Sequence, residues 1–251
     1  MKKKTITEKE NQELELELVK GFGKGIWLDG ILNLTEYNRT TPKILWILKE
    51  GNWGDDFHGN KDDTEKLSLE DAKEILINKQ KMKNDYYSDI TQPHKPGYNG
   101  WKATFKNIMY ITHGIIENIY KWDDMSNITM NCKIDDKYYM DNIAFINIKR
   151  AVGSSNAINN LVQDSYNKHK ELLFKQIEII NPDIIFNCSR IDKVMTDFMP
   201  DTPKNTTDFY FDFAHDKKRL FINTYHPMQT KIKHNIYVDN NLEIIKHFTD
   251  N

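Results

Sequence analysis

Four short apolar runs constrain the fold of this 251-residue chain more than any other feature. They are KILWIL (43–48), NIAFINI (142–148), DIIFNC (183–188) and RLFINTY (219–225). Each run has the length of a strand and is continuously apolar, which is typical of strands that are covered on both faces. Helical patterns separate most of the runs, as the crossover connections of a parallel sheet require. The sequence therefore predicts an α/β fold, a three-layer α/β/α arrangement with a four-stranded parallel central sheet.

Helical periodicity occupies most of the chain between these runs. Helices are expected at 8–22, 68–83, 101–119 and 156–181, where apolar residues recur every three or four positions. In the last connection, 190–218, only the stretch 189–199 has a helical pattern.

Composition limits the class of protein. The length fits a single domain spanning 1–251, and no apolar run approaches the ~20 residues needed to cross a bilayer. Two cysteines, Cys132 and Cys188, are too few for a disulfide framework or a Cys₄ cluster, which fits a reducing compartment. A cytoplasmic location is expected, and the protein is expected to be a monomer. The formal net charge of −2 argues against nonspecific coating of nucleic acid but allows a local basic patch.

The ends of the predicted strands carry polar side chains, and such ends gather at one edge of a parallel sheet. Glu50 follows the first run, and its carboxylate can orient a water or stabilise a cationic transition state. Asn147 ends the second run and can read one edge of a nucleobase. His226 follows the fourth run and can donate to a developing oxyanion. Taken singly, each also fits a structural role: a surface glutamate paired with Lys49, a turn asparagine and a packed histidine.

Aromatic and basic residues lie next to these positions. Trp53 and Phe57 follow the first run and can stack on a flat ring or pack as part of a lid. The segment HPMQTKIKH (226–234) places Met228 near Lys231 and Lys233. This segment suits a wedge that enters a duplex while the cations hold phosphates, and an ordinary amphipathic turn is the alternative.

Other chemistries lack their motifs. The sequence has no phosphate-binding loop, dinucleotide glycine fingerprint or hydrolase nucleophile elbow. No His and Cys residues have zinc-site spacing, so no metal and no cofactor is expected.

Taken in order, four motifs resemble those of the uracil-DNA glycosylase superfamily. They are LKEGNW (48–53), FINIKR (145–150), NPDIIFNCS (181–189) and INTYHPM (222–228). The resemblance spans roughly residues 40–230 in order and spacing, with low residue identity. It implies a DNA glycosylase that flips a uracil or modified pyrimidine out of DNA and hydrolyses its N-glycosidic bond.

The resemblance also implies a role for each candidate residue. Glu50 and His226 are catalytic, and DNA is the partner. The base-binding residues are Asn147, Asn52, Trp53 and Phe57, and the DNA-binding residues are Lys149, Arg150, Met228, Lys231 and Lys233.

The chain departs from the family pattern at several places. Gly51 stands where the family usually has Pro, and Met228 stands where it usually has Ser. The segments around 54–100 and 123–141 look like inserted loops. A divergent member with an altered base preference is expected, and a bulky phage-type base would make it a defence factor. A catalytically inactive nucleic-acid-binding relative and a hydrolase of a small nucleoside-like substrate are the alternatives.

Overall fold

The computed structural model describes residues 5–23, 25–52, 67–91, 100–128, 133–135, 137–153, 159–205 and 209–250. Side chains at 50–52, 82–91, 101–103, 151–153 and 250 are outside this description. The helices are α1 (Glu8–Phe22), α2 (Leu34–Arg39), α3 (Leu69–Thr91), α4 (Gly100–Glu117), η1 (Trp122–Asp124), η2 (Tyr139–Asn142), α5 (Asn159–Ile180), α6 (Lys193–Phe198) and α7 (His234–Asp250). The strands are β1 (Gly30–Ile31), β2 (Ile44–Asn52), β3 (Ile143–Gly153), β4 (Ile184–Asn187), β5 (Asp212–His215) and β6 (Leu220–Asn223).

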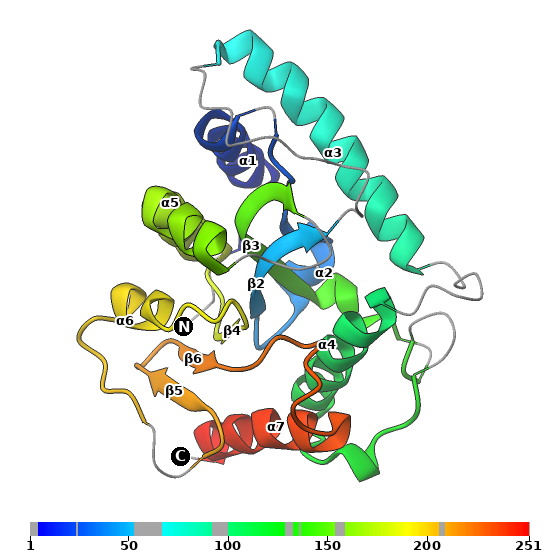
Figure 1. Cartoon of the computed structure of the whole chain (residues 1–251). Helices are drawn as coiled ribbons and strands as arrows, with labels where there is room; N and C mark the ends of the chain where they lie inside the picture. The colour runs from blue at the N-terminus through cyan, green and yellow to red at the C-terminus, as the bar shows by residue number, and fades with distance from the viewer. Residues whose placement is uncertain are drawn as a thin grey trace.

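The strands form one six-stranded mixed sheet in the order β1-β3-β2-β4-β6-β5 (Figure 1). The four predicted strands are β2, β3, β4 and β6, and they pair with one another in parallel. The predicted number of strands is wrong, because β1 and β5 add an antiparallel strand at each edge. Neither gives a clear apolar run in the sequence, because β1 has only two residues and β5 begins with Asp212 and ends with His215.

Apolar side chains pack against both faces of the sheet. One cluster joins β2 residues such as Ile44 and Trp46 to helices α4 and α7. The other joins Leu45 and Ile47 to α5 and α6. Alternate residues of β2 thus enter opposite clusters, as the period of a strand requires. Figure 1 shows α5 and α6 on one side of the sheet and α4 and α7 on the other.

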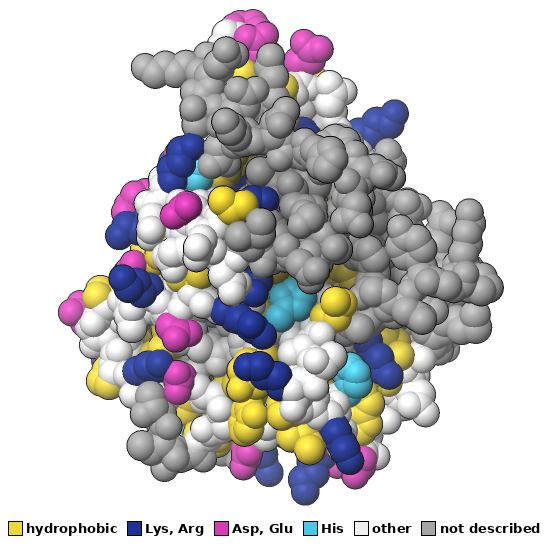
Figure 2. All heavy atoms as spheres, in the orientation of Figure 1, with side chains coloured by type: hydrophobic (Ala, Val, Ile, Leu, Met, Phe, Trp, Pro, Cys, Tyr) yellow, Lys and Arg dark blue, Asp and Glu magenta, His cyan; other side chains and the backbone are white. Residues whose placement is uncertain are grey.

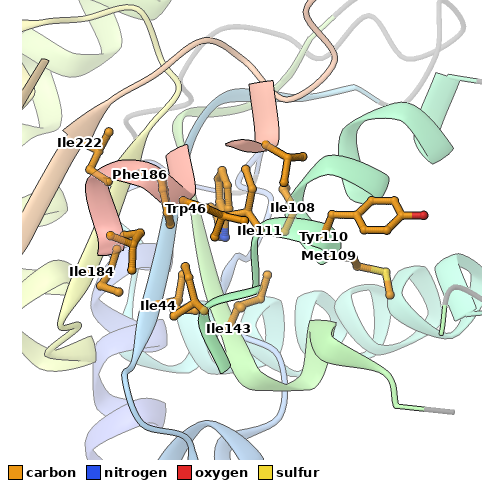
Figure 3. Packing of buried hydrophobic residues seen from close by; sticks show 14 of the residues in the cluster. Ile44, Trp46, Ile108, Met109, Tyr110, Ile111, Ile143, Ile184, Phe186 and Ile222 are labelled. Atoms are coloured by element: carbon orange, nitrogen blue, oxygen red, sulfur yellow. The ribbon is translucent and has the colours of Figure 1, made fainter. Parts of the chain in front are cut away.

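Aromatic stacking marks the centre of the first cluster. The rings of Trp46 and Phe186 stack with centroids 4.2 Å apart, and both side chains are fully buried (Figure 3). These residues lie on neighbouring strands at one register position. The stack therefore fixes the lateral packing of β2 and β4, the two strands at the middle of the sheet.

Helix α3 lies within the segment 54–100 that the sequence marks as an inserted loop. Its first turn is capped by Ser68, whose Oγ accepts from the Asp71 N–H at 3.1 Å. Ala72 and Leu76 of α3 pack in a third apolar cluster with Leu14 and Leu18 of α1. Residues 54–66 and 92–99 of the same segment are outside the described part of the chain.

Among the described residues, no helix combines the length and the apolar character that crossing a membrane would require.

Candidate functional site

The carboxyl ends of the four parallel strands lie at one edge of the sheet. Leu48 of β2 pairs with Asn147 of β3, and Ile47 of β2 pairs with Asn187 of β4. Asn187 in turn pairs with Asn223, the last residue of β6. His226 follows three positions later, so the segment after Asn223 carries it beyond the same edge. The edge thus brings together the ends of the strands that carry Glu50, Asn147 and His226.

His226 is a partly buried histidine whose protonation state follows from its surroundings. Burial, and then the charges of Lys49 and Arg190, lower the pKa of its imidazole to about 4. The ring is therefore neutral at pH 7. Its Nδ1 lies 3.2 Å from the Met228 backbone nitrogen and accepts that N–H. A neutral ring that accepts at Nδ1 carries its proton at Nε2, so Nε2–H is available as a donor.

Two buried side chains hold the backbone around His226 in place. The Tyr237 hydroxyl donates to the Tyr225 carbonyl oxygen at 2.7 Å. The carboxamide of Asn107, a fully buried residue of α4, donates through Nδ2 to the Pro227 carbonyl oxygen. The residues on both sides of His226 are thus bound to helices α4 and α7, and the imidazole is held in a preorganised position.

A closed turn follows His226. The Gln229 N–H donates to the His226 carbonyl oxygen at 2.8 Å, and the Gln229 carboxamide makes two 3.0 Å hydrogen bonds to the backbone of Ile232. Met228 is 46% exposed at this turn. Lys231 and Lys233 are exposed as well, so three of the five residues predicted to contact DNA lie on the surface in the segment that follows His226.

Two further cations adjoin the imidazole, and the sequence did not single them out as site residues. Lys49 lies in the last half of β2, and its Nζ donates to Asn159 Oδ1 at 3.0 Å. Arg190 follows β4, is exposed, and has a left-handed backbone with φ of 63°. Because each charge lowers the pKa of His226, both lie close enough to act on negative charge that collects there. The sequence offered one signal for Lys49 and Arg190: like Glu50 and Asn147, they lie near the ends of predicted strands.

A buried network of hydrogen bonds around Asn187 fixes the loop that carries Arg190. Asn187 Oδ1 accepts from the Ser189 N–H at 3.2 Å and from its Oγ at 2.6 Å. Asn187 Nδ2 donates to the Ile191 carbonyl oxygen at 3.1 Å and to Asn223 Oδ1 at 2.8 Å. The Asn187 side chain is thus engaged on both ends, and its role here is to fix the chain around Arg190.

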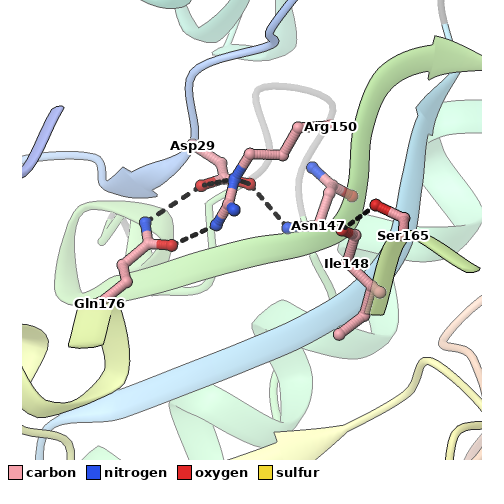
Figure 4. Close-up of polar contacts among 6 residues, drawn as sticks. All are labelled: Asp29, Asn147, Ile148, Arg150, Ser165 and Gln176. Carbon is pink, nitrogen blue, oxygen red and sulfur yellow. Dashed lines mark hydrogen bonds and ion pairs between the residues drawn. The ribbon is translucent and has the colours of Figure 1, made fainter. Parts of the chain in front are cut away.

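Asn147 is buried, at 3% exposure, and its backbone is held by a carboxylate. Its N–H donates at 2.7 Å to Oδ2 of Asp29, the residue immediately before the two-residue strand β1 (Figure 4). The dashed lines in Figure 4 reach the Asn147 backbone nitrogen, and none joins its carboxamide to another residue drawn there. The hydrogen bond to Asp29 thus fixes the backbone of Asn147, the residue whose side chain is predicted to read a base.

Arg150 does not lie where the sequence interpretation placed it. Its side chain is 1% exposed, and its Nε lies 3.2 Å from Asp29 Oδ2. Its guanidinium also donates to the Gln176 carboxamide and lies 4.7 Å from the centre of the Phe22 ring. The prediction that Arg150 contacts DNA is therefore wrong, because the guanidinium is fully engaged inside the protein.

The remaining candidates lie at the same edge but are described only in part. Glu50 pairs with Lys149 across β2 and β3, and Asn52 pairs with Gly153; the side chains of Glu50 and Asn52 are outside the description. Lys149 is partly exposed. Trp53 and Phe57 lie outside the described residues.

Neither cysteine chemistry nor a metal centre is found in the described part of the site. Burial raises the pKa of the Cys188 thiol well above its usual range, so this group is not a thiolate at neutral pH. In the portion of the chain that is described, no three His, Cys, Asp or Glu side chains group as metal ligands would.

Comparison with family models, with curated proteins and with solved structures gave no match to this chain.

Proposed function

We propose that this protein is a DNA glycosylase that extrudes a uracil or a modified pyrimidine and hydrolyses its N-glycosidic bond, leaving an abasic site. The observation that carries the proposal is the state of His226. A neutral imidazole that carries its proton at Nε2, in the field of the Lys49 and Arg190 charges, is suited to stabilise an anion that leaves a sugar. The motif resemblance supplies the nature of that anion, a pyrimidine base.

The chemistry can be written as one balanced substitution. A water oxygen bonds to C1′ of the sugar while the bond between C1′ and the base nitrogen breaks. The electron pair of the broken bond leaves with the base. His226 Nε2–H donates to the base as negative charge collects on it, and the charges of Lys49 and Arg190 add to this stabilisation. In the proposal, Glu50 orients the water, accepts its proton and stabilises the oxocarbenium-like sugar.

Recognition of the base is assigned to the neighbouring strand ends. Extruding a nucleotide costs a few kcal/mol of unstacking, which contacts in the pocket must offset. Asn147 bonds the Watson–Crick edge, with Asn52 beside it, and Trp53 or Phe57 stacks on the ring.

Contact with the rest of the DNA is assigned to the surface beside His226. Met228, exposed on its closed turn, enters the duplex as a wedge. Lys149, Lys231 and Lys233 hold phosphates and thereby set the register of the protein on the strand.

The finer features of the fold belong to the same proposal. A three-layer α/β/α domain would present this edge to DNA as a monomer in the cytoplasm. The long segments around 54–100 and 123–141 suit a pocket rebuilt for a bulky base. Modified phage DNA is therefore the substrate that we favour, with phage defence as the role.

Excision on a panel of oligonucleotides tests the proposal. Duplex and single-stranded substrates carrying uracil, hydroxymethylcytosine or glucosylated hydroxymethylcytosine are incubated with the protein, and abasic sites are cleaved with alkali. Strand breakage at one modified position, lost in Glu50→Gln and in His226→Gln, is the expected result.

Glu13→Gln is the matched control, because it makes the same change on an exposed residue of α1, at 65% exposure, and should leave breakage unaltered. Breakage that persists in Glu50→Gln would contradict the assigned mechanism. Release of base from free nucleosides but not from DNA would instead indicate a nucleoside hydrolase.

A further inference from the structure

We infer that Tyr210 and Tyr225, together with Lys231, form a stacking surface for a nucleobase that neighbours the extruded nucleotide. This surface is called the tyrosine platform below. The inference rests on the proposed function for the identity of the partner, and it adds two residues that the motif comparison does not single out. Its basis is a pair of aromatic rings in contact, Tyr210 exposed and Tyr225 partly buried, the second of which directly precedes the proposed catalytic histidine in the chain.

The two rings of the tyrosine platform are in contact and differ in exposure. Tyr210 is 52% exposed, whereas Tyr225 is partly buried. Their centroids lie 6.1 Å apart with the planes at 85°, an edge-to-face contact. The neighbouring Tyr225 side chain raises the pKa of the Tyr210 phenol, consistent with the contact between the rings. The exposed ring is therefore held by its neighbour, and much of its surface faces solvent.

Apolar packing fixes the platform to the protein. The Phe211 ring contacts both tyrosines edge-to-face, with centroids 5.0 Å from Tyr210 and 5.4 Å from Tyr225. Phe211 itself is 4% exposed and belongs to the main apolar cluster. Stacking on a ring that is already ordered loses less conformational entropy than stacking on a free side chain.

The platform is also fixed relative to the site. Tyr225 directly precedes His226 in the chain, and its carbonyl oxygen accepts from the Tyr237 hydroxyl at 2.7 Å. A base stacked on the tyrosines would thus lie within about one or two nucleotides of a base bound at His226, since neighbouring nucleotides are ~3–7 Å apart along a strand.

The charge beside the rings suits a nucleic acid. Lys231 Nζ lies 4.8 Å from the centre of the Tyr225 ring. Lys231 is exposed, so a phosphate of a bound strand can approach its ammonium group. Figure 2 shows apolar and basic side chains lying side by side on this face of the molecule, close to a histidine. Alternating aromatic faces and cations are typical of surfaces that bind single strands.

Equilibrium binding to a single-stranded oligonucleotide tests the inference without requiring catalysis. The probe carries 2-aminopurine next to the position of the target base, and its fluorescence reports stacking as well as affinity. Base–aromatic stacking of ~1–3 kcal/mol predicts that Tyr210→Ala weakens binding by about 5- to 150-fold. Tyr210→Phe keeps the ring and should bind within about twofold of the wild type, which separates stacking from the hydroxyl group.

The outcomes separate this inference from the proposed function. Equal binding by the wild type and Tyr210→Ala, or equal losses in the Ala and Phe variants, would overturn the tyrosine platform even if excision is observed. Binding that depends on the Tyr210 ring would support the platform even if no base is excised. The absence of excision would in that case contradict only the proposed glycosylase function. If the wild type does not bind the probe, the platform is overturned.

Discussion

Removing the Asp29 carboxylate should destabilise the protein by a large fraction of its total stability. The side chains of Asp29 and Arg150 are 0% and 1% exposed, so Asp29→Ala leaves a guanidinium inside the protein without its counter-charge. Breaking a buried pair in this way costs ~3–5 kcal/mol. The Asn147 N–H also loses its acceptor, and an unpaired buried donor costs ~1–3 kcal/mol. These costs overlap, so we expect a loss of at least about 3 kcal/mol from a typical ~5–15 kcal/mol.

The assay is urea unfolding followed by tryptophan fluorescence and by circular dichroism, with the free energy of unfolding extrapolated to water. Glu13→Ala is the matched control: it breaks the exposed Lys9–Glu13 pair, at 84% and 65% exposure, and should cost under about 0.5 kcal/mol.

The double variant Asp29→Leu/Arg150→Met removes both charges and should be more stable than Asp29→Ala, because no buried charge is left unpaired. A loss below about 1 kcal/mol in Asp29→Ala would refute the reasoning. It would mean that Arg150 finds water or another partner, and Arg150 would return as a candidate for DNA contact.

Two further predictions follow from burial at the site. Because the pKa of His226 is about 4 in the folded protein and ~6.5 in the unfolded chain, the unfolded chain binds the extra proton between these values. Stability should therefore fall as the pH drops from about 6.5 to 4, and it should fall less in His226→Gln; equal pH dependence would show that the imidazole is not desolvated. The Cys188 thiol, fully buried with a raised pKa, should resist iodoacetamide in folded Cys132→Ser and react once urea unfolds the chain. Rapid labelling without denaturant would contradict the packing around β4.

The sheet could be predicted from the sequence where burial is continuous. Ile44 to Leu48 are buried on both faces of the sheet, and such runs are distinctive even in a single sequence. The edge strands escaped prediction because neither is a continuous apolar run: β1 has two residues, and only the two middle residues of β5 are apolar. Gly30 and Ile31 pair with Phe145 and Ala144, more than a hundred positions away.

Arg150 shows why the site was harder to predict than the sheet. Lys149 and Arg150 are adjacent at a strand end and look alike in sequence, yet neighbouring residues of a strand point to opposite faces. Only the tertiary fold places Asp29 and Gln176 against one of those faces. A buried ion pair across 121 positions leaves no local signal, so the sequence offered Arg150 as a surface cation.

His226 was predictable for the opposite reason. Its position after an apolar run and before Pro227 places it at a strand end by local pattern alone. Its low pKa and its Nε2 proton were not predictable, because they depend on Lys49, Arg190 and a backbone turn that only the fold assembles.

Release of a free base from DNA tests the central claim most directly. Wild-type protein is incubated with duplexes that each carry one modified pyrimidine, and the released base is identified by mass spectrometry and counted against abasic sites. If the protein is a DNA glycosylase, one free base is released for each abasic site on at least one substrate, and Glu50→Gln releases none. Tight binding to these duplexes without release of any base would contradict this function, and would leave a nucleic-acid-binding protein without glycosylase activity.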